Sequence, residues 1–152
     1  MSFKLPHVLS RYRRDYEVDE ATSEAHEREL KRYFICVVAF RGQVMGMTGP
    51  VDDLWHTFLM FTKEYEDFSD LVAGRFLHHQ PEVEGKFNER AARNYRRFLK
   101  AYEVVFKEQP NEKFWPRKNL THASWCADGS MCACAGSDGC GCGCGGCGCG
   151  CN

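Results

Sequence analysis

Cysteine is distributed very unevenly along this chain of 152 residues. Of its ten cysteines, only Cys36 lies in the first 125 residues, and the other nine lie in the segment 126–152. That segment also holds nine glycines, no Lys or Arg, and no large apolar side chain except Met131. It cannot bury enough apolar surface to offset the entropy lost on ordering so much glycine. We therefore expect a folded domain over 1–125 and a Cys/Gly tail over 126–152 that is disordered unless a covalent bond or a metal ion holds it.

The charges of the chain are balanced. Its 20 Lys and Arg and 21 Asp and Glu give a formal net charge of −1, which argues against electrostatic recognition of nucleic acid or of an anionic membrane. No apolar run approaches the roughly 18 residues that a membrane span needs, and the N-terminus lacks the apolar stretch of a secretory signal. We expect a cytoplasmic protein.

Apolar residues in the folded region recur at the three- and four-residue spacings of amphipathic helices. One helix is predicted to start after an N-cap at Asp19, and a second after a cap at Thr48 or Gly49, with Pro50 in its first turn. The predicted buried positions of these two helices are Leu30, Tyr33, Phe34, Val37 and Val38, then Val51, Leu54, Trp55, Phe58 and Leu59.

Two further helices are predicted downstream. One is capped by Thr62 and ends at Gly74 in a left-handed conformation; the other opens at Asn88 and ends before Pro110. Their predicted buried positions are Tyr65, Phe68, Leu71 and Val72, then Ala91, Ala92, Tyr95, Phe98, Leu99, Tyr102, Val105 and Phe106. Apart from a short extended piece at 43–47, no segment alternates like a strand, so we predict an all-α fold, a small bundle of about four helices.

One set of polar residues in the second helix and the loop after the third is able to carry chemistry. Asp52 and His56 stand four residues apart on one helix face, so the carboxylate can orient the imidazole or share a metal ion with it. With His78 or His79 folded over them, the set has the ligand types of a zinc or iron site. Two other interpretations stay open: a structural role, with Asp52 bonded to backbone N–H groups and Trp55 filling the core, and acid–base catalysis.

Residues 51–81 resemble the glycine-rich domain-containing proteins. The resemblance rests on a DxxWH pattern formed by Asp52, Trp55 and His56. It also includes Thr62, Tyr65, Phe68, Gly74, the pair His78-His79 and Pro81. It implies a small helical domain followed by a glycine-rich tail, and this chain departs from that pattern by carrying Cys at every second or third position of its tail.

The sequence favours a protein without catalytic residues. It contains no HExxH, GxSxG or P-loop motif. Cys36, on the apolar side of the first predicted helix, is expected to be a small buried side chain and not a nucleophile.

The tail is the second candidate metal site. Its nine thiols are Cys126, Cys132, Cys134, Cys140, Cys142, Cys144, Cys147, Cys149 and Cys151. The Cys-x-Cys spacing resembles that of metallothioneins, and clustered thiolates select soft ions. We therefore expect a non-enzymatic protein whose tail binds zinc or copper(I), although the tail lacks the Lys residues usual in metallothioneins and carries Asp128 and Asp138.

Three alternatives for the tail remain open. It resembles the Cys-rich end of a ribosomally made peptide precursor, which a modifying enzyme would process as its partner. It also has an odd number of thiols, which suits disulfide cross-linking to another protein. Finally, it fits a low-complexity extension without defined chemistry.

Overall fold

The computed structural model describes residues 3–41, 43–79, 89–117 and 120, and within these ranges the chain forms five α-helices and no strand. The helices are α1 (Pro6–Tyr16), α2 (Glu20–Ala39), α3 (Pro50–Leu59), α4 (Thr62–Ala73) and α5 (Glu89–Phe106). The all-α prediction is confirmed. The predictions for segment 126–152 lie outside the described residues.

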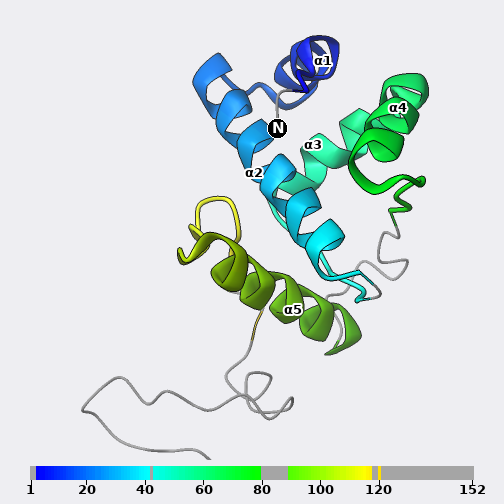
Figure 1. Cartoon of the computed structure of the whole chain (residues 1–152). Helices are drawn as coiled ribbons and strands as arrows, with labels where there is room; N and C mark the ends of the chain where they lie inside the picture. Colours follow the sequence, from blue (N-terminus) through cyan, green and yellow to red (C-terminus); the bar gives the residue numbers. More distant parts are fainter. Residues whose placement is uncertain (1–2, 42, 80–88, 118–119, 121–152) are drawn as a thin grey trace, which may run out of the picture.

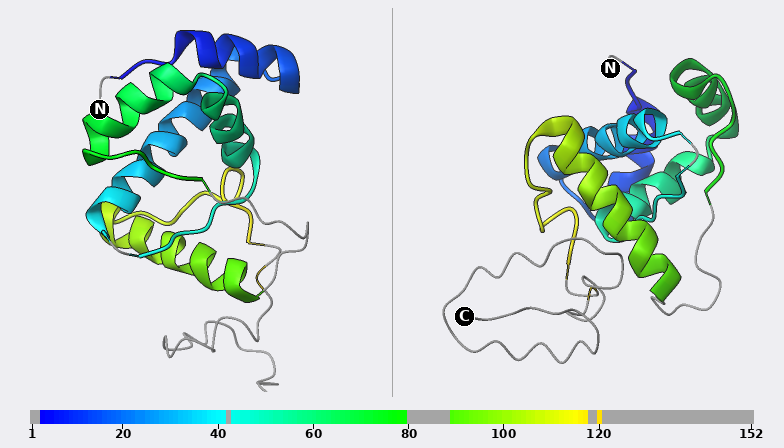
Figure 2. Two further views of the ribbon diagram at one scale, coloured as in Figure 1. Left: turned by 90° about the vertical axis from the view of Figure 1, so that its right-hand side faces the viewer. Right: turned by 60° about the horizontal axis from the view of Figure 1, so that its bottom comes forward.

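The long helix α2 is the centre of the bundle (Figure 1). It contacts each of the other four helices, while α3 also packs against α1 and α4. The left view of Figure 2 places α1 and α5 at opposite ends of the domain, with α2 running between them. No helix of the described ranges is long and apolar enough to cross a membrane.

Three of the predicted helix ends are confirmed. The Asp19 side chain accepts a hydrogen bond of 2.8 Å from the Thr22 backbone N–H, Gly49 precedes α3, and Gly74 ends α4 in the left-handed conformation. The predicted cap at Thr62 is wrong by one residue, because α4 begins at Thr62 and its N-cap is Phe61. The 43–47 segment is irregular instead of a strand.

Helix α1 is absent from the sequence prediction, although its signals are present. Pro6 occupies the first turn, where a missing backbone N–H is tolerated. Val8, Leu9 and Tyr12 follow at helical spacing and are all buried. The acidic and basic side chains of 11–17 obscure this short apolar face.

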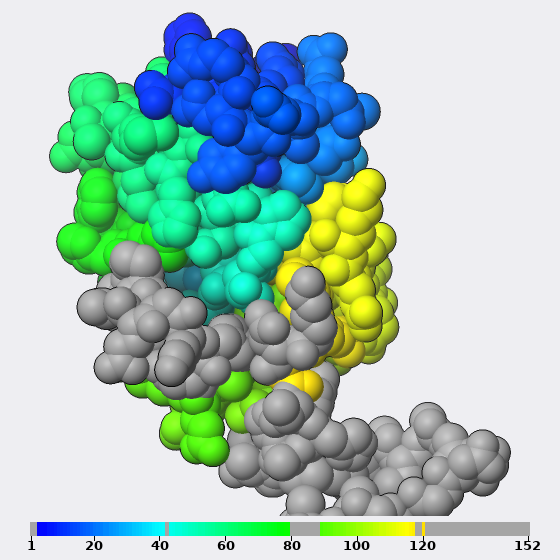
Figure 3. All heavy atoms as spheres, turned by 180° about the vertical axis from the view of Figure 1, so that it is seen from behind, coloured from blue at the N-terminus to red at the C-terminus, as the bar shows by residue number. Residues whose placement is uncertain are grey.

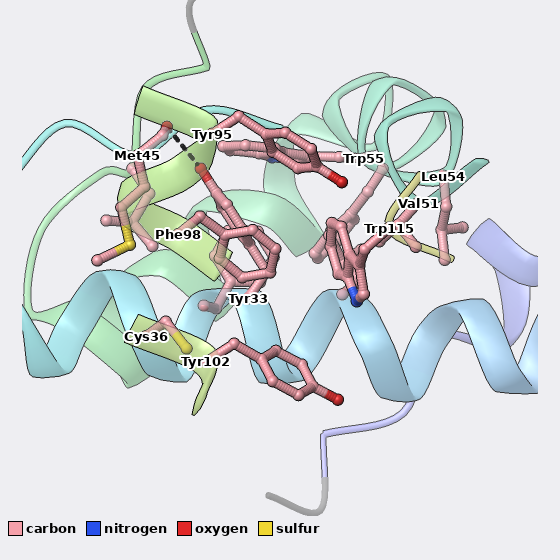
Figure 4. Close-up of a cluster of buried hydrophobic side chains, with 14 of the residues drawn as sticks. Tyr33, Cys36, Met45, Val51, Leu54, Trp55, Tyr95, Phe98, Tyr102 and Trp115 are labelled. Atoms are coloured by element: carbon pink, nitrogen blue, oxygen red, sulfur yellow. Dashed lines mark hydrogen bonds between the residues drawn. The ribbon is translucent and has the colours of Figure 1, made fainter. Parts of the chain in front are cut away.

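The core is rich in aromatic side chains, as Figure 4 shows for its central part. Tyr33 packs against Trp55, Phe98 and Trp115, with ring centroids 5.0–6.3 Å apart. Most of the predicted buried positions are buried or partly buried, but Leu71 is 69% exposed, which contradicts its prediction. Because α4 is covered on one side only, its outward positions remain in solvent.

The segment after α5 is held against the domain by a buried carboxylate. Glu29 of α2 accepts hydrogen bonds from the Trp115 indole N–H (2.7 Å) and from the Tyr102 hydroxyl (3.1 Å). Pro116 lies so close to Gly49 that a side chain at position 49 would meet its ring at 2.8 Å. In Figure 3 residues 107–117 lie beside the residues that lead into α3.

A candidate metal centre at Asp52, His56 and His79

Helix α3 places two candidate ligands on one face. Gly49, with a φ of 94°, lets the chain turn into Pro50 and start the helix. Asp52 then lies in the first turn and His56 in the last. The four-residue spacing puts both side chains on the side of α3 that faces the chain after α4.

His79 is brought to this face by the irregular segment that follows α4. Its imidazole stacks on the indole of Trp55, with ring centroids 4.2 Å apart and an interplanar angle of 13°. The imidazole of His56 also lies next to that of His79, with ring centroids 4.6 Å apart. His79 is thereby placed over the face of α3 on which Asp52 and His56 lie.

The donor atoms of these three residues converge. The Nε2 atoms of His56 and His79 are 2.7 Å apart, and Nε2 of His79 is 3.3 Å from Oδ1 of Asp52. One ligand atom from each of the three residues lies within 4.8 Å of the others. The side chain of His79 is 10% exposed and that of Asp52 is 25% exposed, so the group is shielded without being sealed from solvent.

Oδ1 of Asp52 has an unusual environment. It is buried, yet it accepts no hydrogen bond from any described residue. The 3.3 Å approach of His79 Nε2 is an ion-pair distance whose angles do not make a hydrogen bond. Buried carboxylate oxygens without a partner are costly, and a bound cation is one way to satisfy them. The predicted structural role of Asp52, in which its carboxylate accepts hydrogen bonds from backbone N–H groups, does not explain why Oδ1 is buried without a hydrogen bond from the described residues.

The imidazoles of His56 and His79 also approach each other through the same atom, Nε2. At 2.7 Å two Nε2–H groups cannot point at each other, so at least one ring presents its lone pair there. Either a shared proton or a metal ion can occupy this position. With metal–nitrogen bonds of about 2.0–2.1 Å, a tetrahedral ion separates two ligand atoms by about 3.3 Å. Binding would therefore move the imidazoles apart by only a fraction of an ångström.

The charge of Asp52 influences its neighbours. Burial raises the pKa of Asp53, and the carboxylate of Asp52 raises it further, while His56 opposes this. Burial also raises the pKa of the Tyr33 hydroxyl, with Asp52 as the next cause. The carboxylate of Asp52 therefore acts electrostatically both on its neighbour in α3 and on a tyrosine of the core.

The remaining candidate residues lie elsewhere. His78 is exposed, and its ring lies beside Phe76, with centroids 5.0 Å apart, so it does not join the other three. The nine tail cysteines lie outside the described residues. Cys36 is fully buried, as predicted, and burial raises the pKa of its thiol to about 11.

Trp55 and Tyr65 are predicted from the sequence as core side chains, and their contacts with the site are not predicted. Trp55 is 5% exposed and Tyr65 is fully buried, so the core assignment is correct. Trp55 nevertheless forms the surface on which His79 lies. Its position next to His56 in the chain was the available signal, since consecutive helix residues point to adjacent faces.

The fold and the site together define an all-helical domain with a two-histidine, one-carboxylate cluster at one edge of its core. The chain belongs to the UCP032817-like family, whose model matches residues 2–117. The match covers all five helices and every residue of the cluster. Neither a curated protein nor a solved structure is significantly similar to the chain.

Proposed function

We propose that this chain is a metal-binding protein and that its helical domain holds one divalent ion between Asp52, His56 and His79. The observation that carries the proposal is the convergence of two imidazole nitrogens on a buried carboxylate oxygen that accepts no hydrogen bond from any described residue. One carboxylate and two neutral imidazoles leave a divalent ion with a net positive charge, so the site retains affinity for a further anionic ligand.

The donor set favours particular ions. Imidazole nitrogen and carboxylate oxygen suit zinc, iron(II), cobalt and nickel, whereas copper(I) and cadmium prefer sulfur. Zinc or iron(II) is therefore the ion proposed for this site.

The test uses the full chain with all nine tail cysteines replaced by serine, so that thiolates do not bind the added metal. The protein is stripped with a chelator and titrated with Zn²⁺, and with Fe²⁺ in the absence of oxygen, while bound metal is measured by calorimetry and elemental analysis. One ion per chain is expected. His56→Ala and His79→Ala should each weaken binding at least about tenfold, because loss of even a residue that only orients a ligand costs about 10- to 100-fold.

His78→Ala is the matched control, because it removes an exposed imidazole from the neighbouring position. It should bind metal as the parent does. Equal losses in His78→Ala and His79→Ala, or no binding by the parent, would contradict the proposed site.

The tail is proposed as a second, softer metal site. It is supported by the Cys-x-Cys blocks at 132–134, 140–144 and 147–151, whose thiolates suit zinc or copper(I). Replacing the six cysteines at 140–151 by serine should abolish most copper(I) binding without changing the helical circular dichroism. Unchanged copper stoichiometry would eliminate this site and leave modification by an enzyme or disulfide cross-linking as roles for the tail.

The resemblance to the glycine-rich domain-containing proteins supports a finer family assignment than the matched model gives. Of its residues, Asp52, Trp55 and His56 all lie at the proposed centre. We propose that the domain is a small member of that group, and that it acts in the cytoplasm, where the thiols of the tail stay reduced.

A further inference from the structure

His79 differs from the other two proposed ligands because it does not lie on a helix. Helix α4 ends at Gly74, and the chain continues without regular structure to His79. Asp52 and His56 are fixed by the backbone hydrogen bonds of α3, whereas His79 lies outside the helices of the described residues. Its place in the site therefore depends on contacts that hold the segment 75–79 against the helices.

A buried tyrosine provides the first of these contacts. The hydroxyl of Tyr65, in α4, donates a hydrogen bond to the backbone carbonyl of Leu77, two residues before His79. The Leu77 side chain is 6% exposed and belongs to the core. The backbone leading to His79 is thus tied to α4 at a defined point.

The indole of Trp55 provides the second contact. Its face supports the imidazole of His79, and its Nε1–H donates a hydrogen bond of 3.1 Å to the hydroxyl of Tyr65. Tyr65 is thereby an acceptor from Trp55 and a donor to Leu77. A single hydroxyl connects the ring under His79 with the backbone that carries His79.

We propose that Trp55 and Tyr65 are positioning residues for the metal centre, which set the position of His79 relative to Asp52 and His56. This inference rests on the proposed function. A shared tetrahedral ion requires the Nε2 atoms of His56 and His79 to lie about 3.3 Å apart, close to the 2.7 Å observed. The site therefore tolerates only a small displacement of His79, and the residues that hold His79 in place matter for binding. A displacement of His79 by one or two ångströms would remove it as a ligand.

The chain offers a matched control for the Tyr65 hydroxyl. Tyr33 is also a buried tyrosine, and its hydroxyl donates to the backbone carbonyl of Met45, twelve residues away, as Tyr65 does to Leu77. Met45 does not belong to the segment that carries His79. Tyr33→Phe therefore removes the same chemical group from the core without releasing that segment.

The experiment titrates Co²⁺ into the serine-substituted full chain and its variants, and records the visible absorption bands of the bound ion. Tyr65→Phe should bind Co²⁺ about 10- to 100-fold more weakly than the parent, the range for loss of a group that orients a ligand. Its weaker absorption should approach that of His79→Ala, because water replaces the imidazole. Tyr33→Phe should keep the parent's affinity and spectrum.

Trp55→Phe is a second variant, which retains a ring beneath His79 but cannot donate to Tyr65. It should weaken Co²⁺ binding less than Tyr65→Phe does, and it tests the proposal even if Tyr65→Phe does not fold. Circular dichroism at the titration temperature identifies the variants that are folded. If every folded variant of Trp55 and Tyr65 binds Co²⁺ like Tyr33→Phe, the positioning role is wrong.

The two proposals fail in different ways. If the parent chain binds no Co²⁺, the metal centre itself is wrong. If the parent binds Co²⁺ and His56→Ala abolishes this binding, but Tyr65→Phe does not weaken it, the metal centre stands and only the positioning role is overturned.

Discussion

The indole of Trp55 lies parallel to the imidazole of His79, with their centroids 4.2 Å apart, although the two residues come from a helix and from an irregular segment 24 positions later. Stacked aromatic rings at this distance gain favourable contact energy. The stack gains further when the imidazole carries positive charge, from a proton or from a bound cation, because the face of an indole attracts cations. A change in the charge carried by the His79 imidazole should therefore alter the fluorescence of Trp55.

The first prediction uses this coupling. Binding of Ni²⁺ to the metal-free, serine-substituted chain should quench part of the tryptophan fluorescence, because the ion would lie within a few ångströms of Trp55. The chain has three tryptophans, so Trp55→Phe should abolish most of the nickel-dependent change while leaving emission from the others. His78→Ala should keep the full response, and quenching that survives in His56→Ala would show that nickel binds elsewhere.

The second prediction concerns the buried carboxylate of Glu29. Replacing it by alanine leaves the indole N–H of Trp115 and the hydroxyl of Tyr102 without their acceptor. Loss of one partner of a buried charged hydrogen bond costs about 3 kcal/mol. Glu29→Ala should therefore lower the free energy of unfolding by about this amount, as measured by urea denaturation followed by circular dichroism.

Glu24→Ala is the control for this prediction, because Glu24 is an exposed residue of the same helix. It should change the free energy of unfolding by less than about 0.5 kcal/mol. Similar losses in the two variants would mean that the removal of a glutamate side chain from α2, and not the buried network, determines the effect.

The third prediction compares two glycines that tolerate alanine poorly for different reasons. A Cβ atom at Gly46 would lie 2.9 Å from the backbone nitrogen of Tyr95 in α5, so the irregular segment must move away from that helix. A Cβ at Gly74 would meet nothing within 4 Å, but its φ of +63° is strained for alanine.

Gly46→Ala should thus lower the free energy of unfolding by about 2–3 kcal/mol, and Gly74→Ala by about 1 kcal/mol. The two values are measured by urea denaturation under the same conditions. Equal values, or a larger loss at Gly74, would contradict the packing of residue 46 against α5.

Much of the helical architecture is predictable because it depends on local signals. The cap at Asp19, Pro50 at the start of α3 and Gly74 after α4 each act through the backbone within one turn, and each is found as predicted. Buried faces follow the helical period with few exceptions. Leu71 is one, because whether a face is covered depends on which helices pack together, and the spacing of one helix carries no information on that.

The candidate site is predictable only in part for the same reason. The four-residue spacing places Asp52 and His56 on one face, but the choice between His78 and His79 depends on the path of an irregular segment. That path is determined by the contacts of Tyr65 and Trp55, which join parts of the chain distant in sequence. Glu29 and Trp115, 86 positions apart, are missed for this reason too.

The fourth prediction is a pH dependence from His26. The Tyr12 hydroxyl donates to the carbonyl of Pro50, so it accepts from Nδ1–H of His26 at 2.9 Å. Burial lowers the pKa of His26, and Lys113 lowers it further. The unfolded chain therefore binds a proton at higher pH than the folded chain does, and folding stability should fall as pH decreases below about 6.5.

Urea denaturation of the metal-free protein between pH 7.5 and 5 measures this effect. His26→Gln should be less stable at neutral pH but should lose less stability on acidification than the parent does. His7→Gln is the control, since His7 is exposed, and it should follow the parent. A parallel decline in His26→Gln would assign the acid sensitivity to other groups.

The last prediction separates Cys36 from the nine tail thiols. The Cys36 side chain is fully buried, and the pKa of its thiol is raised to about 11, by burial and then by Glu29. At pH 8 only about a thousandth of such a thiol is ionised, and the thiolate is the reactive form. Reduced, metal-free protein is first treated with one alkylating reagent, then unfolded in guanidinium and treated with a second.

Peptide mapping should find the second reagent on Cys36. A first-reagent label on Cys36 in the folded protein, formed as fast as on a small-molecule thiol, would contradict its burial. The result also bears on the tail, because any metal bound by thiolates in the folded chain must then be assigned to 126–152. A metal that blocks alkylation there and leaves Cys36 unlabelled would distinguish a tail site from a site that recruits the core thiol.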